Sequence, residues 1–408
     1  METLNGTKNF IARQPIFSQD NEVHGYEILF RSGPENYFSN TGADVSSIAL
    51  DNFLQFGFDR VTSGHLAFFN CSRDFLLREH LTLLPPDRVV GEILETVTAD
   101  TEVLEACRRL KAAGYSLALD DFVDSRQMAP LIELANYIKI DILATPVEEQ
   151  ARILRELKQN KVQFLAEKVE THEAFQSAIS MGYQYFQGYF FCRPQVAERK
   201  VIPAHKFNYL RILQLANRPE LDIEELAAAI KLEASMIYRL LRFMNSPVFG
   251  FRTNVGSIAH ALTLLGDRGI RKWISLASIA VMGEDKPAEL VSIPLVRARF
   301  CELIGTNTNL SAKSNDLFLM GLLSAMDALL DTPMNILLET VPVSGEIKEA
   351  LLGKRGQFRD IFEIVSNYES GTWDPLLQAA GRAHVSEDLL PELFLESLDW
   401  ANDVINTK

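Results

Sequence analysis

The sequence predicts an α/β barrel of the TIM type followed by an all-helical domain, and three observations support this fold class. The chain has 408 residues, which is too long for one ordinary hydrophobic core and indicates two domains. Before about residue 200, short apolar runs typical of buried strands alternate with segments of helical periodicity. After that point a period of about 3.6 residues persists to the end. We therefore place a barrel domain at 1–200 and a helical domain at 201–408.

The first half contains seven apolar runs that we interpret as strands, at 25–30, 66–69, 88–94, 116–119, 137–142, 162–166 and 183–191. Helical periodicity is found at 46–56, 102–113, 127–134, 148–159 and 172–181. This alternation implies a parallel sheet, open or closed. Seven or eight repeats in about 200 residues fit a (β/α)₈ barrel at the small end of its size range.

Composition limits the partners of the chain. The formal net charge of −14 argues against a general affinity for nucleic acid or for anionic membranes. The four cysteines are scattered without a C-x-x-C pair, which suits a reducing cytosol and offers no zinc site. The N-terminus lacks the apolar core of a signal peptide, and no apolar run reaches the roughly 18 residues of a membrane helix. We expect a cytoplasmic protein that does not span a membrane.

Polar side chains follow or interrupt most of the predicted strands. The run S-L-A-L at 116–119 ends in two adjacent carboxylates, Asp120 and Asp121, and for one such pair alone a solvated turn is the commoner explanation. The other strands supply comparable groups, namely Glu27, Arg31, Asn70, Glu92, Lys139, Glu167 and Gln187. In a parallel barrel the carboxyl ends of all strands face one way, so these side chains are expected to meet on one rim.

A rim of acids with an asparagine suits two hard cations such as Mg²⁺ or Mn²⁺, and the absence of His and Cys argues against zinc. Two such ions can polarise a phosphate and lower the pKa of a water molecule for attack on phosphorus. Asp120 or Asp121 is the natural bridging ligand, because two metals relieve the repulsion of adjacent carboxylates. Arg31 would hold a phosphate oxygen, and Lys139 would orient the water or stabilise developing charge. The residues thus indicate metal-dependent phosphoester hydrolysis.

The first half resembles the EAL domain, the family of cyclic di-GMP phosphodiesterases, from about Phe10 to Pro194. The matching motifs occur in the family's order along the chain: R-Q-P-I-F at 13–17, E-I-L-F-R at 27–31 (with Ile28 in place of the Ala of E-A-L-x-R), F-N-C-S with Asn70, E-I-L-E at 92–95, D-D-F at 120–122, K-I-D at 139–141, E-K-V-E at 167–170, Q-G-Y at 187–189 and R-P at 193–194.

The resemblance implies the roles of nine residues. It implies that metals are held by Glu27, Asn70, Glu92, Asp120, Asp121 and Glu167. It places Lys139 and Gln187 at the attacking water and the ligand, and Arg31 at the substrate phosphate. Lys139, Glu167 and Gln187 are therefore the expected catalytic residues. The substrate would be cyclic di-GMP and the product linear pGpG.

Two departures from the family pattern leave an alternative open. The D-D-F-G-[ST]-G loop reads D-D-F-V-D-S here, with Val123 and Ser125 in place of glycines. A β-branched residue resists the positive φ that glycine adopts. In E-K-V-E, Lys168 replaces a glycine and could compete for a metal-binding carboxylate or point to solvent. The alternative is a catalytically weak or inactive EAL domain that acts as a cyclic di-GMP sensor or as an interaction scaffold.

After a polar junction at 193–206, the second half is expected to form helices at 205–216, 222–232, 234–244, 257–265, 267–282, 294–305, 314–330, 344–352 and 386–404. Asp222 is the expected N-cap of the second helix, with Glu225 completing a capping box. Residues 222–244 have the outline of a helix-turn-helix, but the second helix offers only Arg239 and Arg242 as bases. A buried helix pair explains this segment better than a DNA-binding motif.

The second half resembles the HDOD domain, a helical relative of the HD phosphohydrolases that lacks their metal ligands. The matching runs are N-S-P-V-F-G at 245–250 and S-I-A-H-A-L-T-L-L-G at 257–266. None of the seven histidines precedes an aspartate, and His260 is interpreted as a core or interface residue. The resemblance implies a regulatory module that binds a signalling partner protein, and it leaves a homodimer open. The combination of both halves resembles the YuxH-type bacterial signalling proteins.

Overall fold

The structure is a computed structural model that describes residues 9–32, 57–122, 128–188, 190, 204–218, 220–244 and 257–406. It contains two compact units. The first comprises Met1–Arg193 together with Ser366–Leu376 and Ser386–Asn402. The second comprises Pro194–Val365, Leu377–Val385 and Asp403–Lys408. Within the described ranges, no helix is both long and apolar enough to cross a lipid bilayer.

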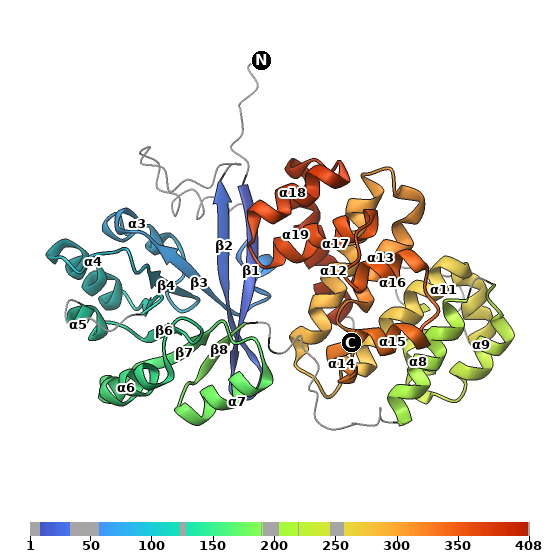
Figure 1. Cartoon of the computed structure of the whole chain (residues 1–408), viewed down its shortest axis with the longest axis horizontal. Helices are drawn as coiled ribbons and strands as arrows, with labels where there is room; N and C mark the ends of the chain where they lie inside the picture. The colour runs from blue at the N-terminus through green and yellow to red at the C-terminus, as the bar shows by residue number, and fades with distance from the viewer. Residues whose placement is uncertain are drawn as a thin grey trace, which may run out of the picture. The chain divides into compact units, whose positions relative to one another are not determined.

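The first unit is built on a closed eight-stranded barrel, which confirms the predicted fold class (Figure 1). Its strands are β1 (Asn9–Ser18), β2 (Val23–Ser32), β3 (Leu66–Cys71), β4 (Val89–Ile93), β5 (Ser116–Leu119), β6 (Tyr137–Asp141), β7 (Gln163–Glu167) and β8 (Tyr185–Gln187). Strands β2 to β8 pair in parallel, as expected. The first strand does not, since β1 pairs antiparallel with both β2 and β8. A short turn links β1 to β2, and two strands joined so tightly can only run antiparallel.

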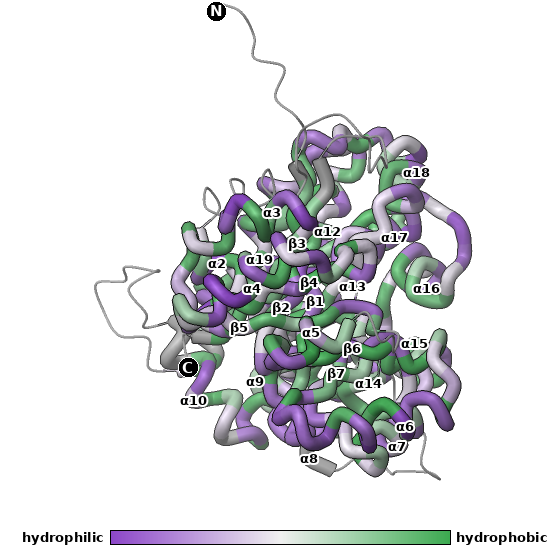
Figure 2. Tube along the Cα trace, turned by 90° about the vertical axis from the view of Figure 1, so that its left-hand side faces the viewer, coloured by the Kyte–Doolittle hydropathy of each residue, from purple (hydrophilic) through white to green (hydrophobic). Residues whose placement is uncertain are grey.

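Helices lie outside the ring of strands (Figure 1). They are α2 (Phe58–Thr62), α3 (Arg73–Leu77), α4 (Thr101–Ala112), α5 (Ala129–Ile132), α6 (Val147–Leu157) and α7 (His172–Met181). Two of the longer ones begin at a side-chain cap: Asp100 accepts from the amide of Val103, and Thr171 accepts from the amide of Ala174. Figure 2 shows hydrophobic and hydrophilic residues alternating along the helices, as expected for elements with one buried face. The helix expected at 46–56 lies outside the described residues.

The barrel interior consists of an apolar layer followed by a polar one. Alternate residues of a strand point inward, so residues two apart on one strand lie in successive layers. The apolar layer is a buried cluster of Ile16, Phe68, Val90, Ala118, Tyr137 and Leu165, with Leu66 and Tyr185 packed against it. Six of these residues are each followed, two positions nearer the carboxyl end of the strand, by a polar residue: Phe68 by Asn70, Val90 by Glu92, Ala118 by Asp120, Tyr137 by Lys139, Leu165 by Glu167 and Tyr185 by Gln187. The strand period therefore places one polar group from each of six strands in a single layer.

A histidine lies at the apolar end of the barrel interior. The His24 ring stacks on Tyr185 with centroids 4.0 Å apart, and its Nε2 lies 3.1 Å from the hydroxyl of Tyr137. Burial, together with a smaller effect of the neighbouring His65, lowers the pKa of His24 to about 4. In the unfolded chain the pKa of a histidine is about 6.5, so the unfolded state binds more protons between these two values. His24 therefore stabilises the folded protein fully above pH 6.5 and loses that contribution as the pH falls toward 4.

We expect acid to destabilise the wild-type protein more than a His24→Gln variant. After allowance for partial exposure, the free energy of unfolding of the wild type should fall by about 2 kcal/mol more than that of the variant between pH 7 and pH 4. The measurement is urea denaturation of both proteins across this range, followed by tryptophan fluorescence and circular dichroism. Parallel curves for the two proteins would show that His24 is not held neutral by its surroundings.

The second unit is helical, as predicted. Its elements, with those that extend into the first unit, are α8 (Ala204–Ala216), α9 (Ile223–Ile230), α10 (Ala234–Met244), α11 (Ile258–Met282), α12 (Ala288–Thr306), α13 (Ser314–Leu323), α14 (Met326–Leu330), α15 (Met334–Thr340), α16 (Gly345–Leu351), α17 (Gln357–Glu369), α18 (Trp373–Ala383) and α19 (Leu390–Asn406). The break expected at Gly266 is a kink inside α11, where this glycine has φ 64° and ψ 168°. The single helix expected at 314–330 is divided into α13 and α14.

Two further expectations for this half have different outcomes. Asp222 caps α9 as predicted, because its side chain accepts from the amides of Glu224 and Glu225. His260 is exposed, so the prediction that it is a core residue is wrong; the interface alternative stays a prediction. It lies in the first turn of α11, close to its N-cap Ser257, where the apolar periodicity of the helix had suggested a buried face. The motif at 245–250 and the junction at 193–203 lie outside the described residues.

Candidate active site

The polar layer converges on the ammonium group of Lys139. This side chain, on β6, is 1% exposed. Its Nζ lies 2.8 Å from Asp120 Oδ1, 2.9 Å from Glu92 Oε1, 2.9 Å from Glu167 Oε1 and 3.2 Å from Glu27 Oε2. These four carboxylates come from β2, β4 and β7 and from the residue that follows β5. One buried cation therefore faces four buried or nearly buried anions.

The carboxylate of Glu27 accepts hydrogen bonds from three side chains. Its Oε2 accepts from Gln187 Nε2 at 2.7 Å and from Lys139 at 3.2 Å, while its Oε1 accepts from Asn70 Nδ2 at 3.2 Å. Glu27 lies opposite Gln14 in the antiparallel pairing of β1 with β2. The closed barrel thus brings Glu27 into contact with three residues that lie 43, 112 and 160 positions further along the chain.

The pKa values of the cluster show that its charges are not balanced. Burial raises the pKa of Glu92 well above its usual range, although Lys139 opposes this. Burial likewise raises the pKa of Glu167 to about 7. For Glu27 burial acts in the same direction, but Lys139, Gln187 and Asn70 together outweigh it, so the pKa of Glu27 is lowered. The pKa of Lys139 is raised despite its burial, because the four carboxylates outweigh desolvation. Additional positive charge would stabilise this arrangement.

The donor set fits divalent cations. Among the described residues, four buried oxygen atoms of this cluster accept no hydrogen bond: Asn70 Oδ1, Gln187 Oε1 and both carboxylate oxygens of Glu92, one of which is near Lys139 without hydrogen-bond geometry. Carboxylate and amide oxygens are the ligands that Mg²⁺ and Mn²⁺ prefer. Among the described residues, no three acidic, His or Cys side chains already form a group that could hold one ion. The reason is geometric, since the Lys139 ammonium lies among the four carboxylates. Ion binding would require these side chains to adjust around it.

The other two predicted site residues, Asp121 and Arg31, are not among the described contacts of Lys139. Asp121 is exposed as a whole residue and has φ 40°. Partial desolvation of its carboxyl group, together with the negative charge of Asp120 beside it, raises the pKa of Asp121. Its carboxylate is not among the four that contact Lys139. The backbone of Arg31 pairs with Phe10 in β1, but its side chain lies outside what the structure describes. Val123 and Ser125 also lie outside the described residues, so the departure in this loop stays a sequence observation.

Lys168 is exposed to solvent, which is one of the two alternatives considered from the sequence, but its ammonium also has a carboxylate partner. Its ammonium forms an ion pair with Asp141 at 2.5 Å, and its side chain remains 59% exposed. The other oxygen of Asp141 accepts from the amides of Leu143 and Ala144. Lys168 has φ 56°, a left-handed conformation that glycine adopts without strain. Lys168 therefore holds the loop after β7 to the end of β6 while the preceding residue, Glu167, points into the cluster.

Gly188 positions Gln187 beside the cluster. A Cβ on Gly188 would lie 2.1 Å from the carbonyl oxygen of Val169, and its φ is 148°. The amide of Val169 donates to the carbonyl of Gln187 at 2.9 Å. Only glycine lets the two backbones approach this closely, so it fixes the end of β8 against the loop that follows Glu167.

Gln14 is a site residue that sequence reasoning missed. Gln187 Nε2 donates to Gln14 Oε1 at 3.0 Å as well as to Glu27. Gln14 Nε2 in turn donates to the carbonyl of Ser370 at 3.1 Å. Ser370 lies in the C-terminal segment Ser366–Leu376, which belongs to the same compact unit as the barrel. In that segment Tyr368 and Trp373 pack on Phe10 with ring centroids 6.2 and 5.4 Å away. The only sequence signal was the position of Gln14 in R-Q-P-I-F, the predicted first strand.

Comparisons with known proteins agree with this architecture. The EAL domain family matches residues 71–194, and the HDOD domain family matches residues 202–331. The uncharacterized protein YuxH of Bacillus subtilis is 31% identical over 409 residues, which cover 98% of this chain and 99% of YuxH. The cyclic di-GMP phosphodiesterase CdgJ of Vibrio cholerae is 32% identical over 401 residues, which cover 97% of this chain and 93% of CdgJ.

Among solved structures, a calcium/cy-diGMP complex of Klebsiella pneumoniae BlrP1 is 26% identical, with a TM-score of 0.38. The match covers 48% of this chain and 57% of that one, so this chain spans less than two thirds of its length. The relation to YuxH and CdgJ extends over nearly the whole of all three sequences. The chain therefore belongs to the family of YuxH and CdgJ, and it combines an EAL domain with an HDOD domain.

Proposed function

We propose that this protein is a cyclic di-GMP phosphodiesterase of bacterial signalling that uses divalent metal ions to hydrolyse cyclic di-GMP to linear pGpG. The observation that carries the proposal is the polar layer of the barrel. Four carboxylates surround one buried lysine, and an asparagine and a glutamine donate to one of these carboxylates. Several oxygens of this cluster accept no hydrogen bond from the described residues. The relation to CdgJ, a cyclic di-GMP phosphodiesterase that is similar across nearly the whole chain, supports the same reaction.

The proposed metal ligands are Glu27, Asn70, Glu92, Asp120, Asp121 and Glu167. When bound, Mg²⁺ or Mn²⁺ would supply electrophilic activation of the phosphodiester and of the attacking water. Hydrolysis adds the hydroxyl group of water to phosphorus, breaks one ester bond of the ring and leaves a proton on the departing ribose oxygen. The product is the open dinucleotide with a terminal phosphate.

The protein's own contribution is positioning and charge. Lys139 Nζ is a buried donor that can orient the water or stabilise negative charge on a phosphate oxygen. Gln187 links β1 and β2 through its bonds to Gln14 and Glu27, and it can present its own free oxygen to the water. Arg31 is proposed to bind a non-reacting phosphate oxygen, for which the planar guanidinium is suited.

The helical HDOD domain is proposed as the regulatory module through which a signalling partner protein acts, and a homodimer remains part of the proposal. The organisation into domains at 1–200 and 201–408 and the cytoplasmic location are likewise proposals. The second compact unit is helical throughout its described residues, and none of them forms a cluster of acidic, His or Cys side chains that could hold a metal.

A second candidate function is a catalytically weak EAL domain that binds cyclic di-GMP as a sensor or serves as a scaffold. The observation in its favour is the D-D-F-V-D-S loop, in which Val123 and Ser125 replace residues that tolerate positive φ. The contacts of Lys139 with four carboxylates are also compatible with a site that holds ions weakly.

One experiment separates these functions. Full-length protein is incubated with cyclic di-GMP and either Mg²⁺ or Mn²⁺, nucleotides are separated by chromatography, and binding is measured in parallel with Ca²⁺. We expect pGpG to accumulate in a metal-dependent way that EDTA abolishes. Binding without pGpG in either metal would contradict the enzyme and support the sensor. If the protein neither binds nor hydrolyses cyclic di-GMP, the result would support a role as an interaction scaffold.

A further inference from the structure

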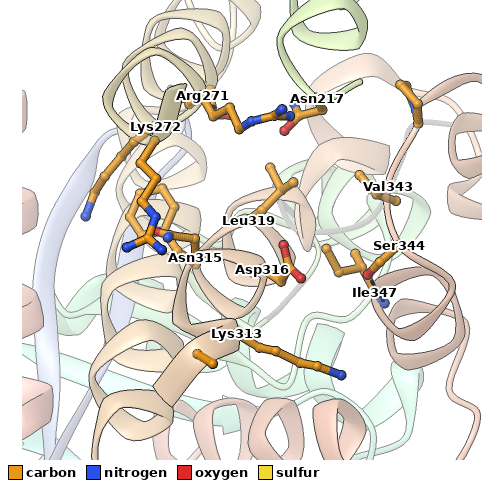
Figure 3. A pocket seen from close by; sticks show the side chains of 15 residues that line it. Asn217, Arg271, Lys272, Lys313, Asn315, Asp316, Leu319, Val343, Ser344 and Ile347 are labelled. Carbon is orange, nitrogen blue, oxygen red and sulfur yellow. Dashed lines mark hydrogen bonds between the residues drawn. The ribbon is translucent and has the colours of Figure 1, made fainter. Parts of the chain in front are cut away.

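The second compact unit contains a cavity of about 530 Å³. It lies between the end of α8, the middle of α11, the start of α13 and the loop that leads into α16 (Figure 3). Its volume falls in the range of roughly 300–1,000 Å³ that is typical of small-molecule sites. No residue of the acidic cluster around Lys139 lines it.

The lining is cationic in an otherwise acidic protein. Arg268, Arg271, Lys272 and Lys313 contribute to it, whereas the whole chain has a formal net charge of −14. Lys272 and Lys313 are paired with Glu302 and Glu346, at 2.9 and 2.7 Å. The guanidinium of Arg271 donates to the carbonyls of Ala216 and Arg218. With Arg268 added, four cationic side chains of the described residues line the cavity and only Asp316 among those residues contributes a carboxylate to the lining, which gives a positive potential that favours an anionic group.

Arg268 is the most available of these cations. It is exposed, and within the described part of the chain it forms neither a hydrogen bond nor an ion pair. It lies one helical turn from Arg271 and Lys272 on α11, so all three can reach the same side of the helix. A guanidinium binds phosphate oxygens through two parallel hydrogen bonds.

The cavity also contains one carboxylate. Figure 3 shows Asp316 between Lys313 and Arg271, near Leu319. Among the described residues, Asp316 accepts no hydrogen bond. Burial raises the pKa of Asp316, as does Glu346, while Lys313 and Arg271 oppose the shift. A half-buried carboxylate of this kind is stabilised by a ligand that donates N–H groups to it.

One wall of the cavity is apolar. Phe318 and Leu319 contribute to it from α13, and Phe318 is buried. Val343 and Ile347 lie across the cavity from Leu319, in the segment around α16 (Figure 3). A flat, weakly polar ring can lie against such a wall while its edge reaches a polar group. The cavity therefore combines a cationic rim, an apolar wall and one carboxylate, with the neutral polar side chains of Asn217, Ser275, Asn315 and Ser344 around them.

We propose that this cavity binds a small ligand of nucleoside monophosphate size, whose phosphate contacts Arg268 and Arg271 and whose N–H donor edge contacts Asp316. A carboxylate has two acceptor oxygens, so it matches the adjacent N1–H and N2–H₂ donors of guanine better than adenine, which offers one donor beside one acceptor. GMP is accordingly the probe of choice. The proposal is independent of the phosphodiesterase reaction, because the cavity and the acidic cluster lie in different compact units.

The test is isothermal titration calorimetry of the full-length protein in EDTA with GMP, AMP, guanosine and inorganic phosphate. We expect GMP to bind at least tenfold more tightly than guanosine or phosphate alone, because only GMP supplies both groups. Arg268→Ala should weaken GMP binding by roughly tenfold. Asp316→Asn should abolish the preference for GMP over AMP, since an amide offers one donor and one acceptor.

Two control variants locate the binding. Arg355→Ala removes another exposed arginine of the helical unit that has no partner in the described residues, and it should leave GMP affinity unchanged. Glu27→Ala alters the acidic cluster and should also leave GMP affinity unchanged. The proposal is overturned if the wild type does not bind millimolar GMP, if Arg268→Ala behaves like Arg355→Ala, or if Glu27→Ala alone abolishes binding. None of these outcomes depends on pGpG formation, so the proposed reaction can fail while this site stands.

Discussion

Glu27→Gln is expected to reduce cyclic di-GMP hydrolysis by about a thousandfold or more, a loss comparable to removal of a principal electrostatic group from an active site. The wild-type carboxylate accepts from Asn70, Gln187 and Lys139 together, and both of its oxygens are used. A glutamine of the same shape keeps one acceptor oxygen and points an NH₂ group toward donors. It also removes one of the negative charges that would bind metal. The change should therefore act on turnover far more than on folding.

The measurement is the rate of pGpG formation at saturating Mg²⁺ or Mn²⁺, with the melting temperature of each variant recorded in the same buffers. Stability should change by no more than about 2 kcal/mol, because the affected hydrogen bonds are few. Glu148→Gln, which neutralises an exposed carboxylate on α6, is the matched control and should retain wild-type activity. Retention of activity within tenfold in Glu27→Gln would remove this residue from the proposed ligand set.

Much of the site could be predicted because strands have a period of two. The run 116–119 appears as β5 with the expected bounds, and Asp120 lies two positions after the inward-facing Ala118. The same spacing links Val90 to Glu92 and Tyr137 to Lys139. Each of these pairs is local in sequence, so a strand assignment was sufficient to predict that the polar members share one layer of the barrel.

What could not be predicted depends on contacts between distant parts of the chain. Gln14 reaches Gln187 only because β1 runs antiparallel and closes the barrel against β8, 173 residues away. Its second partner, Ser370, is 356 residues away in a segment that the periodicity assigned only to a helical half. Neither contact leaves a periodic signal in the sequence.

The partner of the Lys168 side chain could not be predicted from the sequence either. From the sequence it could compete for a metal-binding carboxylate or point to solvent. The outcome was decided by the left-handed backbone at Lys168 and by the position of Asp141 at the end of β6. Both depend on how β6 and β7 pair, since Asp141 lies opposite Glu167 in that register.

Lys139→Met is expected to have the largest effect on stability. Removing one partner of a buried ion pair typically costs about 3–5 kcal/mol, because the other charge remains buried and unpaired. Here four carboxylates lose their common cation, and the apolar methionine cannot donate to any of them. Part of the cost is relieved by proton uptake, since carboxylates crowded in this way are more easily protonated. Turnover should be lost as well.

Metal should reverse the loss of stability but not the loss of turnover. A divalent cation that binds the folded state stabilises it by mass action, and the site without the ammonium is both more negative and less crowded. The melting temperature of Lys139→Met should therefore be well below that of the wild type in EDTA and should rise more than the wild type's in millimolar Mn²⁺. Lys168→Met is the matched control, because Lys168 is 59% exposed and Asp141, its buried partner, keeps the two backbone donors at its other oxygen, so the loss should be small.

The two readouts separate the roles assigned to Lys139. If the ammonium only balances charge, Mn²⁺ will restore both folding and pGpG formation in Lys139→Met. If Lys139 also orients water or stabilises charge on the reacting phosphate, the variant will be folded in Mn²⁺ and remain inactive, and this is the result we expect. Equal melting temperatures of variant and wild type in EDTA would contradict the structure itself, because four carboxylates cannot lose a cation at 2.8–3.2 Å without a measurable cost in stability.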